Sequence, residues 1–381
     1  MFPVKQIPGK RGSDRKKMMA EQKQIVDPKN AGLHPNTFQK KKNVMQKEKP
    51  YPLISVVVPA YNAEKLIACS LESVITQDYP NLEIIVVNDA SKDGTEQAAR
   101  RVLEGCGRPF SIIAHKKNRG VSAARNTGID AMQGEFLWFM DADDKAEPNL
   151  VSTLYALHTK YPCDLSFCGY RNTYEDGSHD AFYPVKLEGD APRSGEELLW
   201  LRIFDKVVTP VCGTLFRKQF LQENSLRFQE GCTAGEDVEF LLKVFCRVRQ
   251  AAFTPECLHI YVHHAGMGSI HENTSKEKQI RRYRDHTDAE IRAAQYLSEY
   301  APSARIKELA DHYLLPQALI RRFTLCARTD DRAEFDSLLS DTATRKVLCS
   351  SRKFFFQKPE VYLKAFALLH IPNLYFRMRR G

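Results

Sequence analysis

The 381-residue sequence predicts an α/β fold with a mostly parallel central sheet, flanking helices and a helical C-terminal extension. Two observations lead to this prediction. Short apolar runs rich in Val and Ile alternate with segments of helical spacing, which is typical of βαβ units. The hydrophobic fraction is 43%, which is ordinary for a protein with a buried core.

Four buried strands are expected in the first part of the sheet. They span residues 53–58, 82–88, 110–115 and 136–140, and Pro59 is expected to break the first of them. Helices are expected between the strands, over residues 64–77, 95–103 and 121–132. Parallel strands joined by helices bring their carboxyl ends to one edge of the sheet, where open α/β sheets bind ligands.

The second part of the chain continues with mixed elements. Strands are expected over residues 164–170 and 211–216, and helices over 194–203, 218–223 and 238–248. Later helices span 280–297 and 306–325, with a kink at Pro316. We therefore expect three regions: a disordered basic tail over 1–50, an α/β domain over 51–270 and a helical region over 271–381.

Positive charge is concentrated at the two ends of the chain. Residues 1–50 carry a net charge of +9 and residues 341–381 carry +7, which leaves −7 on residues 51–340. An acidic body argues against nucleic-acid binding, for which a basic patch should lie on the fold. The basic ends suit contact with anionic lipid headgroups. A solvated N-terminal tail and a C-terminal segment packed on the fold are the alternatives.

Cysteines and apolar runs indicate the compartment. The 10 cysteines are scattered without a Cys-x-x-Cys pair, as expected for buried thiols in a reducing environment, and no zinc site is predicted. No apolar run reaches the ~20 residues of a membrane-spanning helix, and no signal peptide is expected. We expect a cytoplasmic protein whose basic termini allow peripheral contact with the inner face of the cell membrane. Basic and aromatic residues mix over 352–356 and 362–380, which suits a helix in a bilayer interface.

Three carboxylates, Asp141, Asp143 and Asp144, directly follow the apolar run 136–140. Two like charges at ~4 Å repel by roughly 1 kcal/mol in water. A divalent cation would turn this repulsion into binding, and oxygen ligands suit Mn²⁺ or Mg²⁺ shared with substrate phosphates. The alternative is an acidic turn that caps the next helix.

Further polar side chains are expected at the same edge of the sheet. Asp89 and Asp93 follow the second strand, Arg119 precedes the third helix, and Arg125 lies one turn into it. A helix N-terminus offers N–H groups and a positive dipole end to an anion. This set suits a metal-bridged diphosphate. The chain contains no Gly-x-Gly-x-x-Gly or Walker sequence, which argues against dinucleotide oxidoreductases and P-loop NTPases.

Four motifs in order closely resemble glycosyltransferase family 2, which has the GT-A fold. They lie at residues 56–62, 86–95, 118–128 and 139–144, and the resemblance is strong over about 53–154. It implies transfer of a sugar from a nucleotide-sugar, usually UDP-linked, with inversion and a divalent metal. It also implies that Asp89 contacts the base and that Pro59, Tyr61 and Glu64 lie by the nucleotide. Asp141 and Asp143 would form the Asp-x-Asp pair, with Asp143 favoured as the metal ligand.

The pair Glu236-Asp237 matches the catalytic acids of that family, and the resemblance makes Asp237 the general base. An inverting transfer needs a carboxylate to take the acceptor proton, while a metal neutralises the leaving diphosphate. The alternative is that both acids only favour a helix N-terminus.

A later segment matches the family more loosely. His263, His264 and the pair at 268–269 resemble a loop in which a basic or histidine side chain meets the diphosphate or metal. Two extra residues separate the histidines from the glycine. His264 is the preferred ligand, and an exposed loop with two ordinary histidines is the alternative.

The predicted function is a metal-dependent glycosyltransferase that adds one sugar to a glycan or lipid-linked acceptor in surface polysaccharide or lipopolysaccharide synthesis. Processive relatives carry Gln-x-x-Arg-Trp, and neither Trp138 nor Trp200 stands in that motif. One alternative is a nucleotidyltransferase, which would need a Gly-rich phosphate loop that is absent here. Another is a non-catalytic glycan-binding module, which would not need Asp237.

Overall fold

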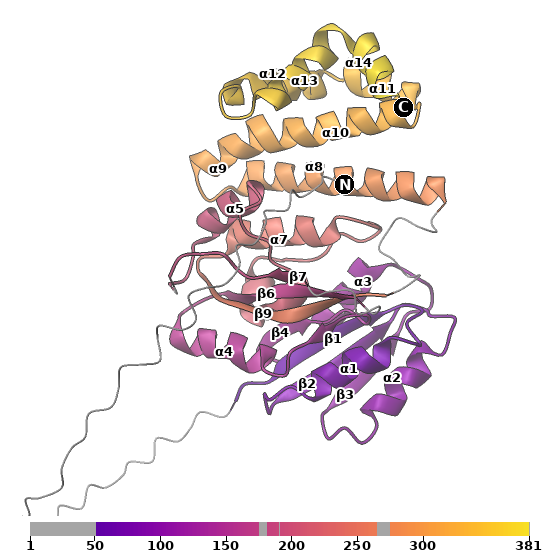
Figure 1. Ribbon diagram of the computed structural model, residues 1–381, viewed down its shortest axis with the longest axis vertical. Helices are drawn as coiled ribbons and strands as arrows, with labels where there is room; N and C mark the ends of the chain where they lie inside the picture. The colour runs from indigo at the N-terminus through magenta and orange to yellow at the C-terminus, as the bar shows by residue number, and fades with distance from the viewer. Residues whose placement is uncertain (1–50, 175–180, 190, 265–274, 381) are drawn as a thin grey trace, which may run out of the picture. The chain divides into compact units, whose positions relative to one another are not determined.

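The computed structural model describes residues 51–174, 181–189, 191–264 and 275–380, all within one compact unit that begins at Pro50 (Figure 1). The tail predicted over residues 1–50 lies outside the described residues. In the described part, strands and helices alternate through the first half, and a run of helices follows.

The first half of the sheet is parallel. Strands lie side by side in the order β3 (Phe110–Ala114), β2 (Leu82–Asn88), β1 (Ile54–Ala60) and β4 (Phe136–Phe139). The connecting helices are α1 (Ile67–Ile75), α2 (Thr95–Leu103) and α3 (Val121–Ala131). The predicted strands agree with these bounds to within two residues. The carboxyl ends of β1, β2 and β4 therefore meet at one edge.

Pro59 does not break the first strand, contrary to the prediction. It lies inside β1 and pairs in register with Val87 of β2. Two residues earlier, the backbone oxygen of Val57 accepts a hydrogen bond from the N–H group of Met140, which follows β4. The backbone polar groups of every second residue of β1 therefore point toward β4. Pro59 faces the same side, beyond the last paired residue of β4, where no N–H group is needed.

The second half of the sheet is mixed. The order continues with β8 (Thr214–Arg217), β6 (Leu165–Tyr174), β9 (Ala251–His263) and β5 (Lys145–Ala146), and β7 (Ala181–Tyr183) pairs with β6. β8 is antiparallel to β4 and to β6, whereas β9 is parallel to β6. The segment 211–213, predicted as strand, is the 3₁₀-helix η1 (Val211–Gly213). Helices here are α4 (Leu150–Lys160), α5 (Gly195–Ile203), α6 (Lys218–Glu223) and α7 (Glu236–Arg247).

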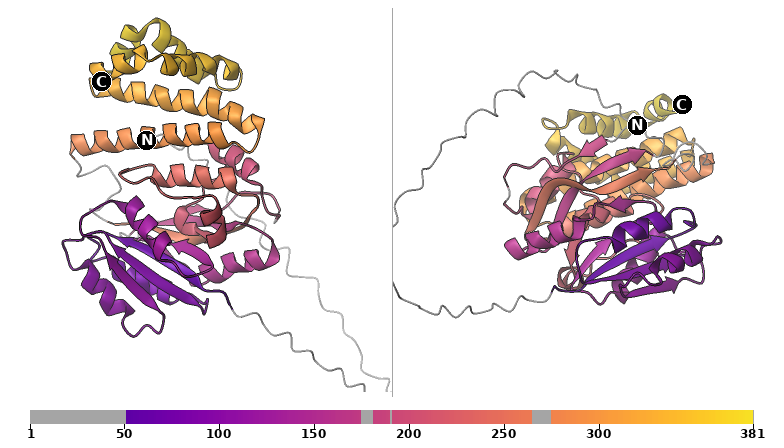
Figure 2. Two further views of the ribbon diagram at one scale, coloured as in Figure 1. Left: turned by 180° about the vertical axis from the view of Figure 1, so that it is seen from behind. Right: turned by 60° about the horizontal axis from the view of Figure 1, so that its bottom comes forward.

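Helices α7, α8 (Lys276–Tyr300) and α10 (Leu315–Arg328) stack as successive layers on the sheet (Figures 1 and 2). Glu239 of α7 is buried and pairs with Arg292 of α8 at 2.7 Å. A kink is expected at Pro316, and the structure has the π-helix η2 (Ala310–Leu314) directly before it, between α9 (Ala304–Leu309) and α10. Such a widened turn accommodates a proline that lacks an N–H group.

The C-terminal residues pack as short helices on α10: α11 (Arg332–Ser340), α12 (Thr342–Ser350), the 3₁₀-helix η3 (Ser351–Phe354), α13 (Pro359–His370) and α14 (Pro372–Arg379). Within the described residues, no helix is both long and apolar enough to cross a membrane.

Two apolar cores cover the two faces of the parallel strands. Val56 and Val58 of β1 belong to one core with α1, α2 and α4, whereas Val57 belongs to the other. This alternation follows the two-residue period of a strand. The second core continues from the sheet through α7, α8 and α10 to Phe376 of α14. The helical region and the sheet thus share one continuous interior.

Candidate active site

Asp89 lies directly after β2, with 2% of its surface exposed. Its carboxylate accepts the backbone N–H groups of Arg119 at 2.9 Å and Gly120 at 2.7 Å. His115 Nδ1 lies 2.6 Å from the same carboxylate, and its Nε2 lies 2.9 Å from Thr127 Oγ1. Asp89 therefore anchors the loop before α3 to the end of β2.

A second polar cluster joins the loop after β1 to the start of α2. Asp93 accepts the backbone N–H groups of Glu64 at 3.2 Å and of Thr95 at 3.1 Å. Glu64 in turn accepts the N–H group of Gly94 at 3.1 Å. These bonds fix the loop in which Tyr61 is 48% exposed. An aromatic ring is thus held open at the edge where the strands end.

The three acids after β4 have different environments. Asp144 is buried and accepts the N–H group of Val262 in β9 at 3.1 Å, whereas Asp143 is exposed. Reduced hydration in the loop and the negative charges of Asp141 and Asp144 raise the pKa of Asp143 to about 6. A bound cation would relieve this repulsion. Asp143 is therefore well suited to bind a divalent metal.

Arg125 of α3 lies between the two acidic groups of the site. Its guanidinium is 5% exposed, and lies 2.8 Å from Asp141 and 3.4 Å from Glu236. It also lies over the ring of Phe228, 5.1 Å from the centroid. Burial alone would raise the pKa of Asp141, but Arg125 outweighs it, so this pKa lies below its usual range. Arg125 thus links the acidic loop after β4 to the start of α7.

The acidic pair occupies the first turn of α7. Gly235 precedes it with φ of 80°, and a Cβ atom there would lie 2.7 Å from His286 Nδ1, so this position requires glycine. Burial raises the pKa of Glu236 despite the nearby Arg125. Asp237 is exposed instead. The structure therefore holds Glu236 inside and leaves Asp237 open to a ligand.

Strand β9 was not predicted, and it adds further residues to the site. His259 Nε2 lies 3.2 Å from the carboxylate of Asp144, and both side chains are buried. Burial and the charges of four nearby acids raise the pKa of Tyr261 to about 12, so its hydroxyl stays protonated. The alternation of Leu258, Ile260 and Val262 with polar residues could have predicted this strand. Pro255 interrupts the pattern.

Two groups of residues are candidates for a cation site. The first group is Asp141 and Asp143, whose carboxylate oxygens suit Mn²⁺ or Mg²⁺; Asp143 is exposed, whereas both oxygens of Asp141 already lie within 3.2 Å of Arg125. His264 lies beside them, with Nε2 2.9 Å from the backbone oxygen of Asp143. The second group is buried, with ligand atoms within 4.8 Å of one another: Asp144, Cys212 and His259. Its aspartate and histidine already pair, so we interpret it as a hydrogen-bonded support beneath the loop.

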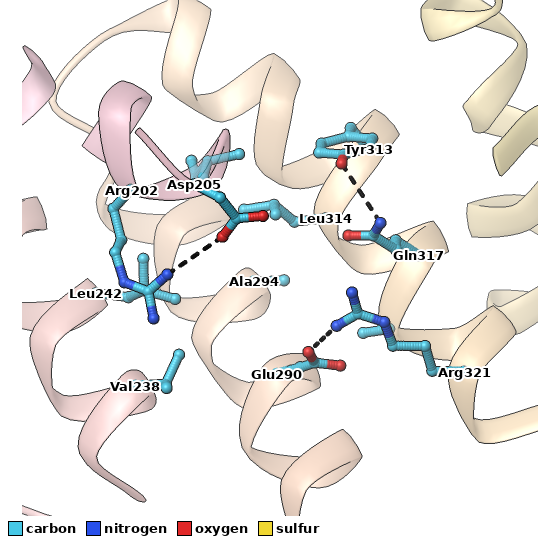
Figure 3. Close-up of a pocket in the computed structure, with 12 residues that line it drawn as sticks. Arg202, Asp205, Val238, Leu242, Glu290, Ala294, Tyr313, Leu314, Gln317 and Arg321 are labelled. Carbon is cyan, nitrogen blue, oxygen red and sulfur yellow. Dashed lines mark hydrogen bonds and ion pairs between the residues drawn. The ribbon is translucent and has the colours of Figure 1, made fainter. Parts of the chain in front are cut away.

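A cavity of about 140 Å³ opens beside α7 (Figure 3). Val238, which directly follows Asp237, is one of its lining residues. Three polar pairs are drawn with dashed lines on its walls: Arg202–Asp205, Tyr313–Gln317 and Glu290–Arg321. The cavity therefore offers hydrogen-bonding groups beside Val238, in the first turn of α7.

Sequence comparison identifies the family. Residues 55–223 match the Glycosyl transferase family 2 model. An uncharacterized glycosyltransferase of Haemophilus influenzae is 30% identical over 238 residues, which is 61% of this chain and 72% of that protein. This chain belongs to glycosyltransferase family 2. YibD of Escherichia coli, also an uncharacterized glycosyltransferase, is 27% identical over 60% of this chain and 67% of its own length. The match to GlyA of Streptococcus pneumoniae is 30% identical but spans only 30% of GlyA.

Structural comparison confirms the fold of this glycosyltransferase. The crystal structure of Staphylococcus aureus TarS 1–349 superposes with a TM-score of 0.64 and 18% identity, over 86% of this chain and 92% of that chain. The predicted GT-A type α/β fold with C-terminal helices is therefore confirmed. The predicted enzyme class, a glycosyltransferase, is confirmed by the family.

The predicted site residues of the glycosyltransferase differ in their exposure and in whether they contact one another. Asp141 and Glu236 meet through Arg125, and Asp143 and Asp237 are both exposed. Pro59 is buried within β1. Arg119, expected near the diphosphate, pairs with Glu230 at 2.9 Å on the surface. Residues 268 and 269 lie outside the described residues.

Proposed function

We propose that this glycosyltransferase moves one sugar per binding event, with inversion, from a nucleotide-sugar to a glycan or lipid-linked acceptor. The observation that carries the proposal is the pair of ion pairs that Arg125 makes with Asp141 and with Glu236. These ion pairs hold the acidic loop after β4 against the first turn of α7. The loop offers carboxylates for a cation on a diphosphate. The helix offers an open carboxylate for a proton.

On the donor side, Asp143 and Asp141 would hold Mn²⁺ or Mg²⁺, with His264 beside them. When bound, the cation supplies positive charge that neutralises the leaving nucleoside diphosphate. Asp89 and Asp93 shape the two loops around the nucleotide, and the exposed ring of Tyr61 offers a surface for the base. TarS, whose fold this chain shares, has been solved with UDP-GlcNAc, so a UDP-sugar is the first donor to test.

On the acceptor side, Asp237 takes the proton of the attacking hydroxyl as the sugar bond breaks. Glu236 stays paired with Arg125 and fixes the helix that presents Asp237. We assign the cavity of Figure 3 to a hydroxyl-rich part of the acceptor, because its lining includes the residue next to Asp237 and several polar side chains.

We place this reaction in surface polysaccharide or lipopolysaccharide synthesis, on the cytoplasmic side of the membrane. Supporting this proposal, TuaG of Bacillus subtilis, a putative teichuronic acid biosynthesis glycosyltransferase, is 32% identical over 127 residues. That match covers 33% of this chain.

Thermal unfolding with nucleoside diphosphates, in the presence and absence of Mn²⁺ or Mg²⁺, tests the donor site. A ligand at 100 times its dissociation constant stabilises the folded state by about 2.7 kcal/mol. We expect one nucleotide to raise the midpoint only with metal, and the matching nucleotide-sugars then serve as donors in transfer assays. If no nucleotide shifts the midpoint with either metal, the donor-site proposal is wrong.

A further inference from the structure

Helix α13 carries apolar side chains on its outer face as well as its inner one. Val361, Ala365 and Leu368 are buried against the rest of the fold. At 100° per residue, the opposite side of the helix presents Leu363 and Phe366, which are 58% and 47% exposed. A surface helix usually places polar residues there. The outer face of α13 is therefore an apolar surface that the described fold leaves uncovered.

The exposed apolar side chains continue from α13 to the segment before it. Ring contacts run without a gap from Phe356 to Phe355 at 5.3 Å, from Phe355 to Tyr362 at 5.2 Å, and from Tyr362 to Phe366 at 6.2 Å. Phe356 is 92% exposed. We name this row, together with Leu363, the aromatic strip. It is one contiguous patch, and not a scatter of single exposed residues.

Basic residues border the aromatic strip. Residues 351–370 contain Arg352, Lys353, Lys358 and Lys364 against the single acid Glu360. In the part of the chain that the structure describes, none of these four cations lies within 4.0 Å of a carboxylate, whereas many other arginines of the fold do. Arg352, Lys353 and Lys364 are exposed, so their charge is available to an external anion. Lys358 is half-buried, with its ammonium 5.4 Å from the centre of the Phe204 ring.

A groove lies beside the strip, and it has the same chemistry. Its aromatic lining residues are Trp200, Phe204 and Phe354, and its charged ones are three cations and one acid: Lys206, Arg305, Lys358 and Glu308. The guanidinium of Arg305 lies 3.6 Å from the centre of the Trp200 ring. Aromatic rings next to cations suit the boundary between lipid headgroups and acyl chains.

We propose that the aromatic strip and its basic border dock on a bilayer that contains anionic phospholipids. Leu363, Phe356 and Phe366 would enter the acyl boundary, while the four basic residues meet the headgroup phosphates. A second copy of the chain fits less well, because two such faces would bring their uncompensated positive charges together. The inference depends on this surface and not on the proposed reaction, so the two can fail separately.

Vesicle sedimentation with the full chain tests the proposal. The vesicles are phosphatidylcholine alone, or phosphatidylcholine with about 30% phosphatidylglycerol. We expect binding to the anionic vesicles, and a loss of about tenfold in partition coefficient for the double variant Phe356→Ser/Leu363→Ser. The variant Arg352→Gln/Lys364→Gln should lose a similar factor, and it leaves the apolar residues intact.

The control is Phe182→Ser/Val208→Ser, which removes two side chains of 59% and 48% exposure outside the C-terminal helices. It should bind as the wild type does. Equal binding by wild type and both strip variants would assign vesicle binding to another segment, such as residues 1–50, and would overturn the proposal. Absence of binding by the wild type would also overturn it. Self-association that only the strip variants abolish would identify a second copy as the partner instead.

Discussion

Nη2 of Arg125 lies 2.8 Å from Oδ1 and 3.2 Å from Oδ2 of Asp141, while Nη1 lies 3.4 Å from Glu236. One buried cation therefore serves two acids that are 95 positions apart in the sequence. Arg125→Met would remove the cation from two carboxylates whose side chains are only 30% and 14% exposed. We expect a loss of about 3 kcal/mol in the free energy of unfolding, measured by urea denaturation.

Arg119→Met is the matched control for that experiment. Arg119 and Glu230 form a surface pair in which both side chains are more than 40% exposed. Removing such a pair should change the free energy of unfolding by about 1 kcal/mol or less. Equal losses for the two variants would show that Arg125 does not organise the site.

Asp237→Asn should abolish transfer and keep donor binding. The amide cannot accept the acceptor proton, so we expect transfer to fall by about 10²- to 10⁴-fold. The nucleotide-dependent rise in unfolding midpoint should be retained. Glu277→Gln removes an acid from the first turn of α8, and it controls for the effect of a helix-terminal charge. Normal transfer by Asp237→Asn would refute its assignment as the base.

Asp143→Asn should alter the pH dependence of stability. Because the folded-state pKa of Asp143 is about 6, above its usual value, protonation favours the folded state. This contribution is present below about pH 4 and is lost as the pH rises through 6. Without metal, the variant should therefore unfold at the same temperature as wild type at low pH, and at a higher temperature above pH 6.

At neutral pH, Mn²⁺ should make the wild type unfold at a higher temperature than Asp143→Asn. Only the wild type has the carboxylate at position 143 that would bind the ion. Asp130→Asn, at a side chain that is 69% exposed, should show neither effect. A metal-dependent midpoint that is the same in wild type and Asp143→Asn would remove Asp143 from the metal site.

Gln317→Leu tests the cavity of Figure 3 as an acceptor site. The change removes an amide that faces the cavity and keeps a side chain of similar size. Loss of one hydrogen bond to the acceptor should raise its KM by about tenfold, with donor binding unchanged. Gln295→Leu, on the exposed side of α8, is the control. An unchanged acceptor KM would place the acceptor elsewhere.

The parallel half of the fold could be predicted from sequence because its signals are local. Each of its strands is a mainly apolar run, and a polar residue follows each strand within two positions. The role of Arg125 could not be predicted in the same way. Its two acids come from different elements, and only the packing of α7 brings Glu236 to it. Its place one turn into a helix indicated that Arg125 lies near a diphosphate, and nothing local in the sequence indicates that Asp141 and Glu236 surround it.

The mixed half of the sheet was harder to predict for a similar reason. The short strand β8 is preceded by a 3₁₀ turn, whose apolar residues look like a continuation of the strand. Strand β9 contains Pro255, which local rules place in a loop. Its position is set by long-range pairing with β6, which sequence periodicity does not report.

Glu239 has only 1% of its side chain exposed, and two cations balance its charge: Lys243 of the same helix at 2.6 Å and Arg292 of α8 at 2.7 Å. It lies within the first turn of the helix that presents Asp237. A protein cut after residue 275 would keep the motifs described above and lose this arginine, which leaves Glu239, two residues after the proposed base Asp237, with Lys243 as its cation. The family motifs are therefore not a self-sufficient module. A chimera that grafts residues 51–270 onto another C-terminal region would lose one of the two cations beside Glu239 unless the new region supplies one at the position of Arg292.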